Sequence, residues 1–188
     1  MQNYRVPLLE LPPEGRQFQL ADAAIWQSPL AEFGMDCRIV QPLRAEIQLI
    51  PTEGGCLIRG HLSGQVALPC NRCAEEALTG IDASFEDFEE LPDAAQDRPP
   101  HLLQDSESQA LHGTERLIFE GASPMLDLAA VCWEEFMLAL PVSPLCKTDC
   151  KGLCPRCGVN RNQSSCNCSE DEGDPRLAVL RGLKLPRQ

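Results

Sequence analysis

The feature that most constrains this chain is a run of six cysteines within 23 residues, from Cys146 to Cys168. The whole chain has 188 residues and 11 cysteines. A chain of this length can bury about 70% of the surface that its unfolded form exposes, so it does not need metal merely to have a core. We therefore expect these six cysteines to stabilise the local structure of their own segment, residues 146–168.

The sequence favours a reducing compartment, in which clustered thiols bind metal or do redox chemistry rather than form disulfides. Residues 1–20 lack the basic start of a secretory leader, and their apolar run is broken by Pro7 and Glu10. No stretch approaches the roughly 18 apolar residues of a membrane span. We expect a cytoplasmic protein without membrane contact.

The segment Cys154-Pro-Arg-Cys157-Gly158 has the form of a zinc knuckle. Two intervening residues let a tight turn present both sulfurs to one ion, and glycine suits the left-handed backbone that often follows. Cys166 and Cys168 return eight residues later and can complete a tetrahedral four-sulfur site. Binding zinc there would supply about 10–16 kcal/mol of apparent free energy to a segment that has almost no core.

A second zinc site is expected from Cys70 and Cys73, which lie at a predicted strand end, together with Cys146 and Cys150. Such a site would tie the strand domain to the cysteine-rich tail. An open alternative is that Cys146 and Cys150 join the first cluster or stay free. Three further cysteines lie within apolar patterns and are expected to be small core residues, namely Cys37, Cys56 and Cys132.

Two interpretations in which the cysteines are catalytic compete with the interpretation as structural zinc sites. Cys70 and Cys73 could form a thioredoxin-like redox pair, but their surroundings indicate antiparallel strands rather than a βαβ unit. The spacing of Cys150, Cys154 and Cys157 matches an iron–sulfur motif of radical enzymes, yet only 31 residues follow Cys157, too few for the barrel of those enzymes. We find no phosphate-binding glycine loop or nucleophile elbow and expect no enzymatic activity.

The N-terminal half of the chain predicts antiparallel strands. Residues 37–90 approximate an alternation of apolar and polar side chains with a period of two, and residues 52–55 form a turn signal. Pro42 cannot donate to a ladder, which predicts an edge position or a bulge. Residues 115–120 can form another short strand. Ser123 and Pro124 then indicate a helix start, with serine at the cap and proline at the first helical position.

Together these signals predict an α+β fold with a mainly antiparallel β core, one principal helix and a C-terminal cysteine-rich zinc-binding segment. The expected organisation is a β-rich core at 1–90, an acidic loop or linker at 91–112, a strand and helix packed on the core at 113–145, the zinc-binding segment at 146–168, and an acidic spacer, short helix and basic tail at 169–188.

The net charge of −12 is unevenly distributed. Residues 82–120 carry 2 basic and 11 acidic side chains, giving −9, whereas residues 146–188 carry 8 and 5, giving +3. Four cations alternate with the expected metal ligands: Lys147, Lys151, Arg156 and Arg161. They can contact RNA phosphates, or they can offset the two negative charges of a four-thiolate zinc centre. The charge pattern leaves both interpretations open.

The cysteine-rich half of the chain resembles the YceD family of large ribosomal RNA subunit accumulation proteins. The matching pieces occur in order: Cys70-x-Arg72-Cys73, Leu138-Ala-Leu-Pro141, Pro144-Leu-Cys146, Asp149-Cys-Lys-Gly-Leu-Cys-Pro155, Cys157-Gly158, Asn160, Cys166, Cys168, and Asp174-Pro-Arg176 with Leu180 and Leu183. Arg161 departs from the pattern, which usually has leucine there, and this puts the packing of the loop before Cys166 in doubt.

The resemblance implies a bacterial or plastid-type factor, non-enzymatic and without a small-molecule substrate, that supports accumulation of large-subunit ribosomal RNA. Its implied partners are that RNA or its precursor and a large-subunit ribosomal protein; whether the four cations contact the RNA directly stays open. The acidity of the chain motivates an alternative, in which the protein is an adaptor for a basic ribosomal protein and never touches RNA.

Overall fold

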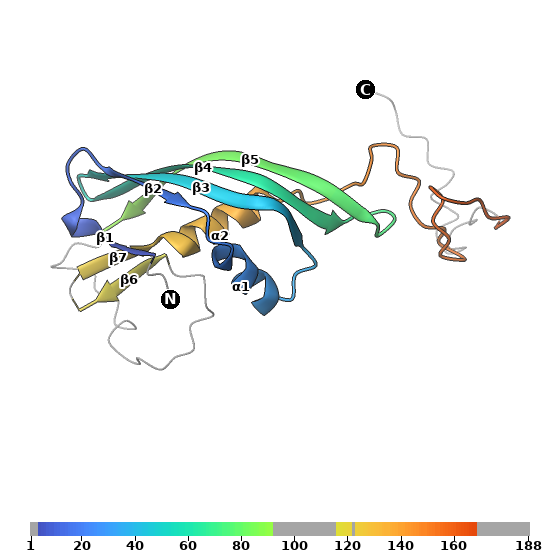
Figure 1. Cartoon of the computed structure of the whole chain (residues 1–188), viewed down its shortest axis with the longest axis horizontal. Coiled ribbons are helices and arrows are strands. Elements are labelled where there is room, and N and C mark those ends of the chain that lie inside the picture. The colour runs from blue at the N-terminus through green and yellow to red at the C-terminus, as the bar shows by residue number, and fades with distance from the viewer. Residues whose placement is uncertain (1–3, 92–115, 122, 169–188) are drawn as a thin grey trace, which may run out of the picture.

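Within the described residues the fold has two antiparallel sheets and two α-helices, which confirms the predicted α+β class with a mainly antiparallel β core (Figure 1). The structure, a computed structural model, describes residues 4–91, 116–121 and 123–168. In chain order the elements are β1 (Arg5–Pro7), the 3-10 helix η1 (Leu8–Glu10), β2 (Arg16–Leu20), α1 (Ala24–Glu32), β3 (Arg38–Thr52), β4 (Gly55–Pro69), β5 (Glu76–Glu90), β6 (Leu117–Glu120), β7 (Ser123–Asp127) and α2 (Leu128–Ala139).

The larger sheet has the order β2-β3-β4-β5, and its three long strands have 15 residues each. Leu49 pairs with Ile58, and Leu62 pairs with Ala83, so apolar side chains repeat on the inner face of the sheet. The ladder between β3 and β4 shifts register between Gln41 and Arg44, on either side of Pro42. This irregularity confirms the predicted bulge, and it accommodates a residue that has no backbone donor.

Both helices and the smaller sheet, ordered β1-β7-β6, lie on one side of the larger sheet (Figure 1). The core forms between these layers. Trp26 of α1 and Phe136 of α2 are fully buried, together with Ile47, Ile58 and Leu62 of the larger sheet. The opposite face of that sheet carries charged pairs such as Arg59–Glu86.

The predicted helix start at Ser123 and Pro124 is wrong. Both residues belong to β7, which is the central strand of the smaller sheet, and pairing with β1 and β6 overrides the local helix signal. Helix α2 begins at Leu128, where the side chain of Asp127 accepts hydrogen bonds from the backbone N–H groups of Ala129 and Ala130. Asp127 is thus the N-cap that satisfies two otherwise unpaired donors.

Helix α1 is an element that the sequence prediction lacks. It has nine residues and contains Pro29, which indicates a helix break when the sequence is considered alone. The backbone of Asp22 and Ala23 accepts its first hydrogen bonds, and Ile25, Trp26 and Leu30 are buried against the core. Tertiary packing therefore stabilises a helix that local propensity does not favour.

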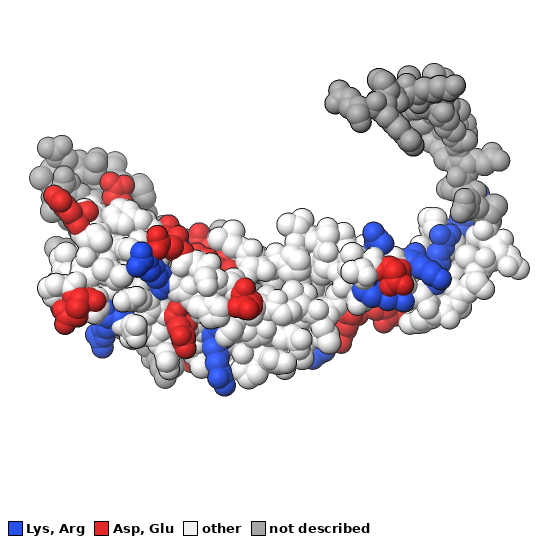
Figure 2. Space-filling model, turned by 90° about the horizontal axis from the view of Figure 1, so that it is seen from above, with Lys and Arg blue, Asp and Glu red and all other residues white. Residues whose placement is uncertain are grey.

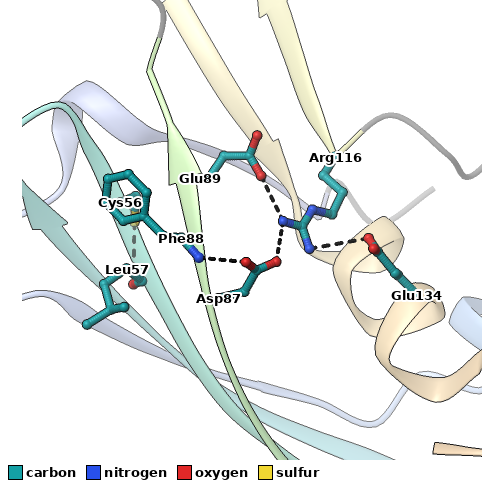
Figure 3. A network of polar contacts seen from close by, with 7 residues as sticks. All are labelled: Cys56, Leu57, Asp87, Phe88, Glu89, Arg116 and Glu134. Carbon is teal, nitrogen blue, oxygen red and sulfur yellow. Dashed lines mark hydrogen bonds and ion pairs between the residues drawn. The ribbon is translucent and has the colours of Figure 1, made fainter. Parts of the chain in front are cut away.

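Arg116 forms a charged network that joins β5 to α2. Its guanidinium lies between Asp87 and Glu89 of β5 and Glu134 of α2, at 3.1 Å from Glu89 and 3.2 Å from Glu134 (Figure 3). Hydrogen bonding to Arg116 lowers the pKa of Asp87. The side chain of Arg116 is only 15% exposed, so the three carboxylates stabilise a cation that is largely removed from water.

Two predicted segments, the acidic linker at 91–112 and the tail at 169–188, lie outside the described residues, except for Leu91 at the start of the linker. None of the helices in the described part of the chain is long and apolar enough to cross a membrane.

Candidate metal centres

Two turns in the chain have the same backbone structure, although they are 84 residues apart in the sequence. In the first turn, the N–H of Ala74 donates to Cys70 O at 2.9 Å, and the N–H of Cys70 donates to Glu75 O at 2.7 Å. In the second, Gly158 N donates to Cys154 O at 2.9 Å, and Cys154 N donates to Val159 O at 2.8 Å. Both turns are therefore knuckles of the kind that presents two sulfurs to one ion.

The residue after each knuckle has a left-handed backbone, with φ of 58° at Ala74 and 72° at Gly158. Glycine is the residue expected there because it has no Cβ to clash in this conformation. Ala74 is the only described residue other than glycine with a positive φ. The first knuckle is formed despite this strain, which indicates that its surroundings hold it in place.

The first knuckle contributes to a four-cysteine group that we call the inner site, formed by Cys70, Cys73, Cys146 and Cys150. The Sγ atoms of Cys70 and Cys150 are 3.8 Å apart, and those of Cys73 and Cys146 are 3.5 Å apart. Three of the four side chains are buried, and Ala77 and Leu145 pack against them. The backbone contributes too, since Asn71 N donates to Pro144 O at 2.8 Å. This group joins the β4–β5 connection to the chain that follows α2 (Figure 1).

The second knuckle contributes to a group that we call the outer site, formed by Cys154, Cys157, Cys166 and Cys168. Cys154 is buried, Cys157 is exposed and the other two are half-buried. In each group the four Sγ atoms lie within 4.8 Å of one another. The structure thus brings together the same two sets of four that the spacing of the cysteines suggests.

The geometry of both groups fits a single metal ion. A zinc–sulfur bond of about 2.3 Å places the corners of a tetrahedron about 3.8 Å apart, which agrees with the separations in the inner site. A disulfide would require about 2.05 Å, and the cysteines are free. An iron–sulfur cluster would hold its cysteines farther apart because several atoms lie between them. Either group can therefore hold a metal ion with sulfur ligands only.

Backbone donors favour the thiolate form of one cysteine in each knuckle. The pKa of Cys70 is lowered to about 6, chiefly by a hydrogen bond from the backbone of Cys146. The pKa of Cys154 is likewise lowered to about 6, chiefly by the backbone of Cys157. By contrast, burial raises the pKa of Cys132 to about 12. Cys70 and Cys154 are therefore suited to binding metal as thiolates, whereas Cys132 is a protonated core residue.

Of the three cysteines predicted to be core residues, Cys56 and Cys132 are fully buried in the body, as predicted. Cys37 is half-buried and packs against the edge of the core.

Arg72 connects the inner site to the outer one. Its carbonyl oxygen accepts a hydrogen bond from Leu153 N at 3.0 Å, and its Nη1 donates to Cys150 O at 2.9 Å. Gly152 has a φ of 71°, and a Cβ there would lie 3.0 Å from Arg72 O. Leu153 also pairs with Asn160 in a short antiparallel bridge. The two metal loops thus pack on each other through their backbones.

Two side-chain donors near the sulfurs could not be assigned from the sequence. Asn162 Nδ2 donates to Cys150 Sγ at 3.2 Å, and Arg161 Nη2 donates to Cys154 Sγ at 3.8 Å. Arg161 is the residue that departs from the family pattern, and its contact with the outer site accounts for a cation at this position. The sequence gives no signal that Asn162 reaches the inner site, because the contact depends on how the two loops pack.

The remaining predicted cations, Lys147, Lys151 and Arg156, are exposed on the cysteine-rich segment, residues 146–168. Figure 2 shows blue side chains gathered at this end of the molecule and more red ones at the opposite end. Arg161 is exposed as well, so its contact with Cys154 leaves it open to solvent.

Comparison with known proteins finds relatives that match most of this chain. A relative from Zea mays, named as a chloroplastic homolog 1 of the large ribosomal RNA subunit accumulation protein YCED, is 26% identical over 87% of this chain and 60% of its own length. An uncharacterized protein of Mycobacterium bovis is 28% identical over 84% of this chain and 77% of its own. A chloroplastic homolog 1 from Arabidopsis thaliana is 24% identical, and the match covers 78% of this chain but only half of the Arabidopsis protein.

No solved structure matches the chain. The family profile described as large ribosomal RNA subunit accumulation protein YceD matches residues 58–184, which include both knuckles and all eight cysteines of the two sites. This chain therefore belongs to the YceD family.

Proposed function

We propose that this protein is a non-enzymatic, zinc-binding factor that supports the accumulation of large-subunit ribosomal RNA in the cytoplasm of a bacterium. The observation that carries the proposal is the match to the YceD family across residues 58–184, a range that contains both four-cysteine groups. The names of the family and of the maize relative refer to accumulation of this RNA.

Zinc is the metal that the site chemistry favours. Four sulfur ligands at tetrahedral separations select zinc or iron among the common biological metals, and the absence of any oxygen ligand disfavours magnesium and calcium. Zinc has no redox chemistry and four protein ligands leave it no open position, so its role in both sites is structural. Elemental analysis of the purified chain should give two zinc per chain and a colourless solution. Stoichiometric iron with a red or brown colour would contradict this assignment.

We propose further that the protein contacts RNA directly through Lys147, Lys151, Arg156 and Arg161. Metal binding displays these side chains on short loops, so their positions are fixed before RNA binds, which lowers the entropy cost of association. The contact is expected to be with phosphates and therefore to weaken with salt. Arg161 has a second role in this scheme, because it donates to the thiolate of Cys154.

The test is recovery of ribosomal RNA with tagged protein from growing cells, followed by binding of purified protein to large-subunit RNA. Replacing Lys147, Lys151 and Arg156 with glutamate should reduce RNA recovery and lower the slope of log affinity against log salt by about 1 for each phosphate that the variant no longer binds. Arg44→Glu is a control, because this exposed cation lies on the outward face of β3. Recovery of no ribosomal RNA by the wild-type protein would overturn the proposal.

A second candidate function is favoured by the acidity of the body. Strand β5 is an edge strand that carries six acidic side chains and no basic one, namely Glu76, Asp82, Glu86, Asp87, Glu89 and Glu90. Such a strand suits a basic ribosomal protein as partner. If the protein is such an adaptor, the triple charge reversal leaves RNA recovery unchanged, and a basic ribosomal protein is recovered instead.

A further inference from the structure

Two neighbouring residues of one loop contact different metal sites. The loop between Cys157 and Cys166 is closed at both ends by outer-site ligands. Within it, Arg161 donates to Cys154 of the outer site, whereas Asn162 donates to Cys150 of the inner site. The outer-site loop therefore supplies a hydrogen-bond donor to a sulfur of the inner site.

We propose that Asn162 is a positioning residue that couples the two metal sites. Metal in the outer site orders the loop and holds the Asn162 amide against Cys150, which strengthens metal binding by the inner site. The coupling rests on the metal-binding part of the proposed function and does not depend on contact with RNA.

The amide of Asn162 is held in one orientation by its other partners. Its Oδ1 accepts a hydrogen bond from Lys151 N at 2.9 Å, and its Nδ2 also donates to Asn160 Oδ1 at 2.9 Å. A backbone N–H can only donate, so the oxygen of the amide must face Lys151. The nitrogen then faces Cys150, and the direction of the N–H···S bond follows from the network rather than from an arbitrary choice.

This hydrogen bond acts on the charged form of the ligand. Four thiolates around a divalent ion carry a net charge of −2, and an N–H donor stabilises a thiolate more than a thiol. Loss of such a partner around a metal ligand typically costs 10–100-fold in metal affinity. By linkage, the inner site must also tighten the outer one by the factor through which the outer site tightens the inner.

Other hydrogen bonds anchor the same loop without touching a sulfur. Gln163 Nε2 and Asn160 Nδ2 both donate to Glu75 Oε1, at 3.1 and 3.3 Å, next to the first knuckle. Gln163 is therefore a matched control for Asn162, because it is an adjacent amide that fastens the loop to the same region.

The experiment measures zinc release from the full-length zinc-loaded chain to a chromogenic chelator. A variant with Cys157→Ser and Cys168→Ser retains the inner site alone and identifies which step of the wild-type curve belongs to it. Asn162→Asp keeps the acceptor for Lys151 but replaces the donor with a carboxylate oxygen. We expect Asn162→Asp and Asn162→Ala to lower the zinc affinity of the inner site by about 10–100-fold. Gln163→Ala should leave it close to wild type.

Two further measurements separate coupling from a loss of loop structure. The variant without the outer site should itself bind inner-site zinc more weakly, and adding Asn162→Asp to it should have little further effect. In the cobalt-loaded protein, removal of the N–H donor should move the sulfur-to-cobalt charge-transfer band to longer wavelength in Asn162→Asp and not in Gln163→Ala.

Unchanged inner-site affinity and an unchanged cobalt spectrum in Asn162→Asp would overturn the coupling while the wild-type protein still binds two zinc. A wild-type chain that binds no metal would overturn the proposed zinc binding and the coupling with it.

Discussion

The body of the protein, residues 4–91, 116–121 and 123–140, and the cysteine-rich segment, residues 146–168, differ in what orders them. The body buries large side chains such as Trp26 and Phe136 between its layers. In the cysteine-rich segment, the buried residues are Cys150, Gly152 and Cys154, none of which supplies a large apolar surface. Hydrophobic burial can therefore account for the first region, while the second has backbone hydrogen bonds and, under the proposed function, metal–sulfur bonds. On that proposal, one part of the chain folds by exclusion of water and the other depends on a ligand.

Removal of metal should affect the cysteine-rich segment and the body very differently. We expect a chelator to increase amide hydrogen exchange throughout residues 146–168 and to leave exchange in β3, β4 and α2 nearly unchanged. The physical reason is that binding contributes about 10–16 kcal/mol of apparent free energy to a structural zinc site. Added zinc should restore protection under reducing conditions. Cooperative melting of the whole chain on chelation would show that the two regions are not separable.

A substitution in the apolar core tests whether hydrophobic burial stabilises the body. Phe136→Ala removes a fully buried ring from α2 and is expected to lower the free energy of unfolding of the body by about 3–5 kcal/mol. Urea unfolding followed by tryptophan fluorescence measures this, with Leu138→Ala as control because that side chain is 72% exposed on the same helix. The folded variant should keep its zinc content. Loss of zinc without loss of body stability would reverse the assignment of roles.

The charged network around Arg116 gives a smaller, pH-dependent effect. Arg116→Met leaves Asp87, Glu89 and Glu134 without their cation, and we expect a loss of about 1–2 kcal/mol at pH 7, discounted because Asp87 is 42% exposed. Arg116 lowers the pKa of Asp87 in the folded state, so this stabilisation is fully present above the unfolded value of about 3.9 and is lost as the pH falls through the lowered folded pKa.

Wild type and Arg116→Met should therefore converge in stability as the pH falls below the lowered pKa of Asp87. Unfolding of metal-free protein at pH 7 and in acid separates this effect from acid release of zinc. A difference that persists undiminished in acid would exclude the Asp87 ion pair as its cause.

Two glycines in the cysteine-rich segment test how tightly its loops must pack to hold zinc. Gly152 and Gly158 have φ of 71° and 72°, so alanine is strained by about 1–2 kcal/mol at either position. A Cβ at Gly158 meets nothing within 4 Å, whereas one at Gly152 lies 3.0 Å from Arg72 O. We therefore expect Gly152→Ala to accelerate zinc release more than Gly158→Ala does. Equal rates would mean that the close approach to Arg72 does not hold the loops together.

The sequence predicted the parts of this structure that depend on short-range patterns. Strand alternation identified β3 to β5, and Pro42 indicated the bulge. The spacing of Cys154 and Cys157 predicted a knuckle because such a turn is a local structure. Grouping Cys70 and Cys73 with Cys146 and Cys150 also agreed with the structure, since four ligands fit one ion.

The features that the sequence did not predict depend on distant interactions. Pairing of Arg5 with Asp127 makes a strand where Ser123 and Pro124 indicate a helix start. Packing of Trp26 against the core stabilises α1 in spite of Pro29. The donor role of Asn162 depends on the packing of two loops that no local pattern specifies.

The inner site joins Cys73 to Cys146 across 73 residues, and this separation orders events during translation. The hairpin of β4 and β5 leaves the ribosome first, with Cys70 and Cys73 at its tip and without the other two cysteines of the inner site. At about 5–20 residues per second, the remaining pair follows roughly 4–15 s later. On the proposed zinc binding, all four sulfurs can hold one ion only after Cys150 has been synthesised. A product truncated before Cys146 would expose Cys70 and Cys73 as an incomplete metal site at the tip of the β4–β5 hairpin.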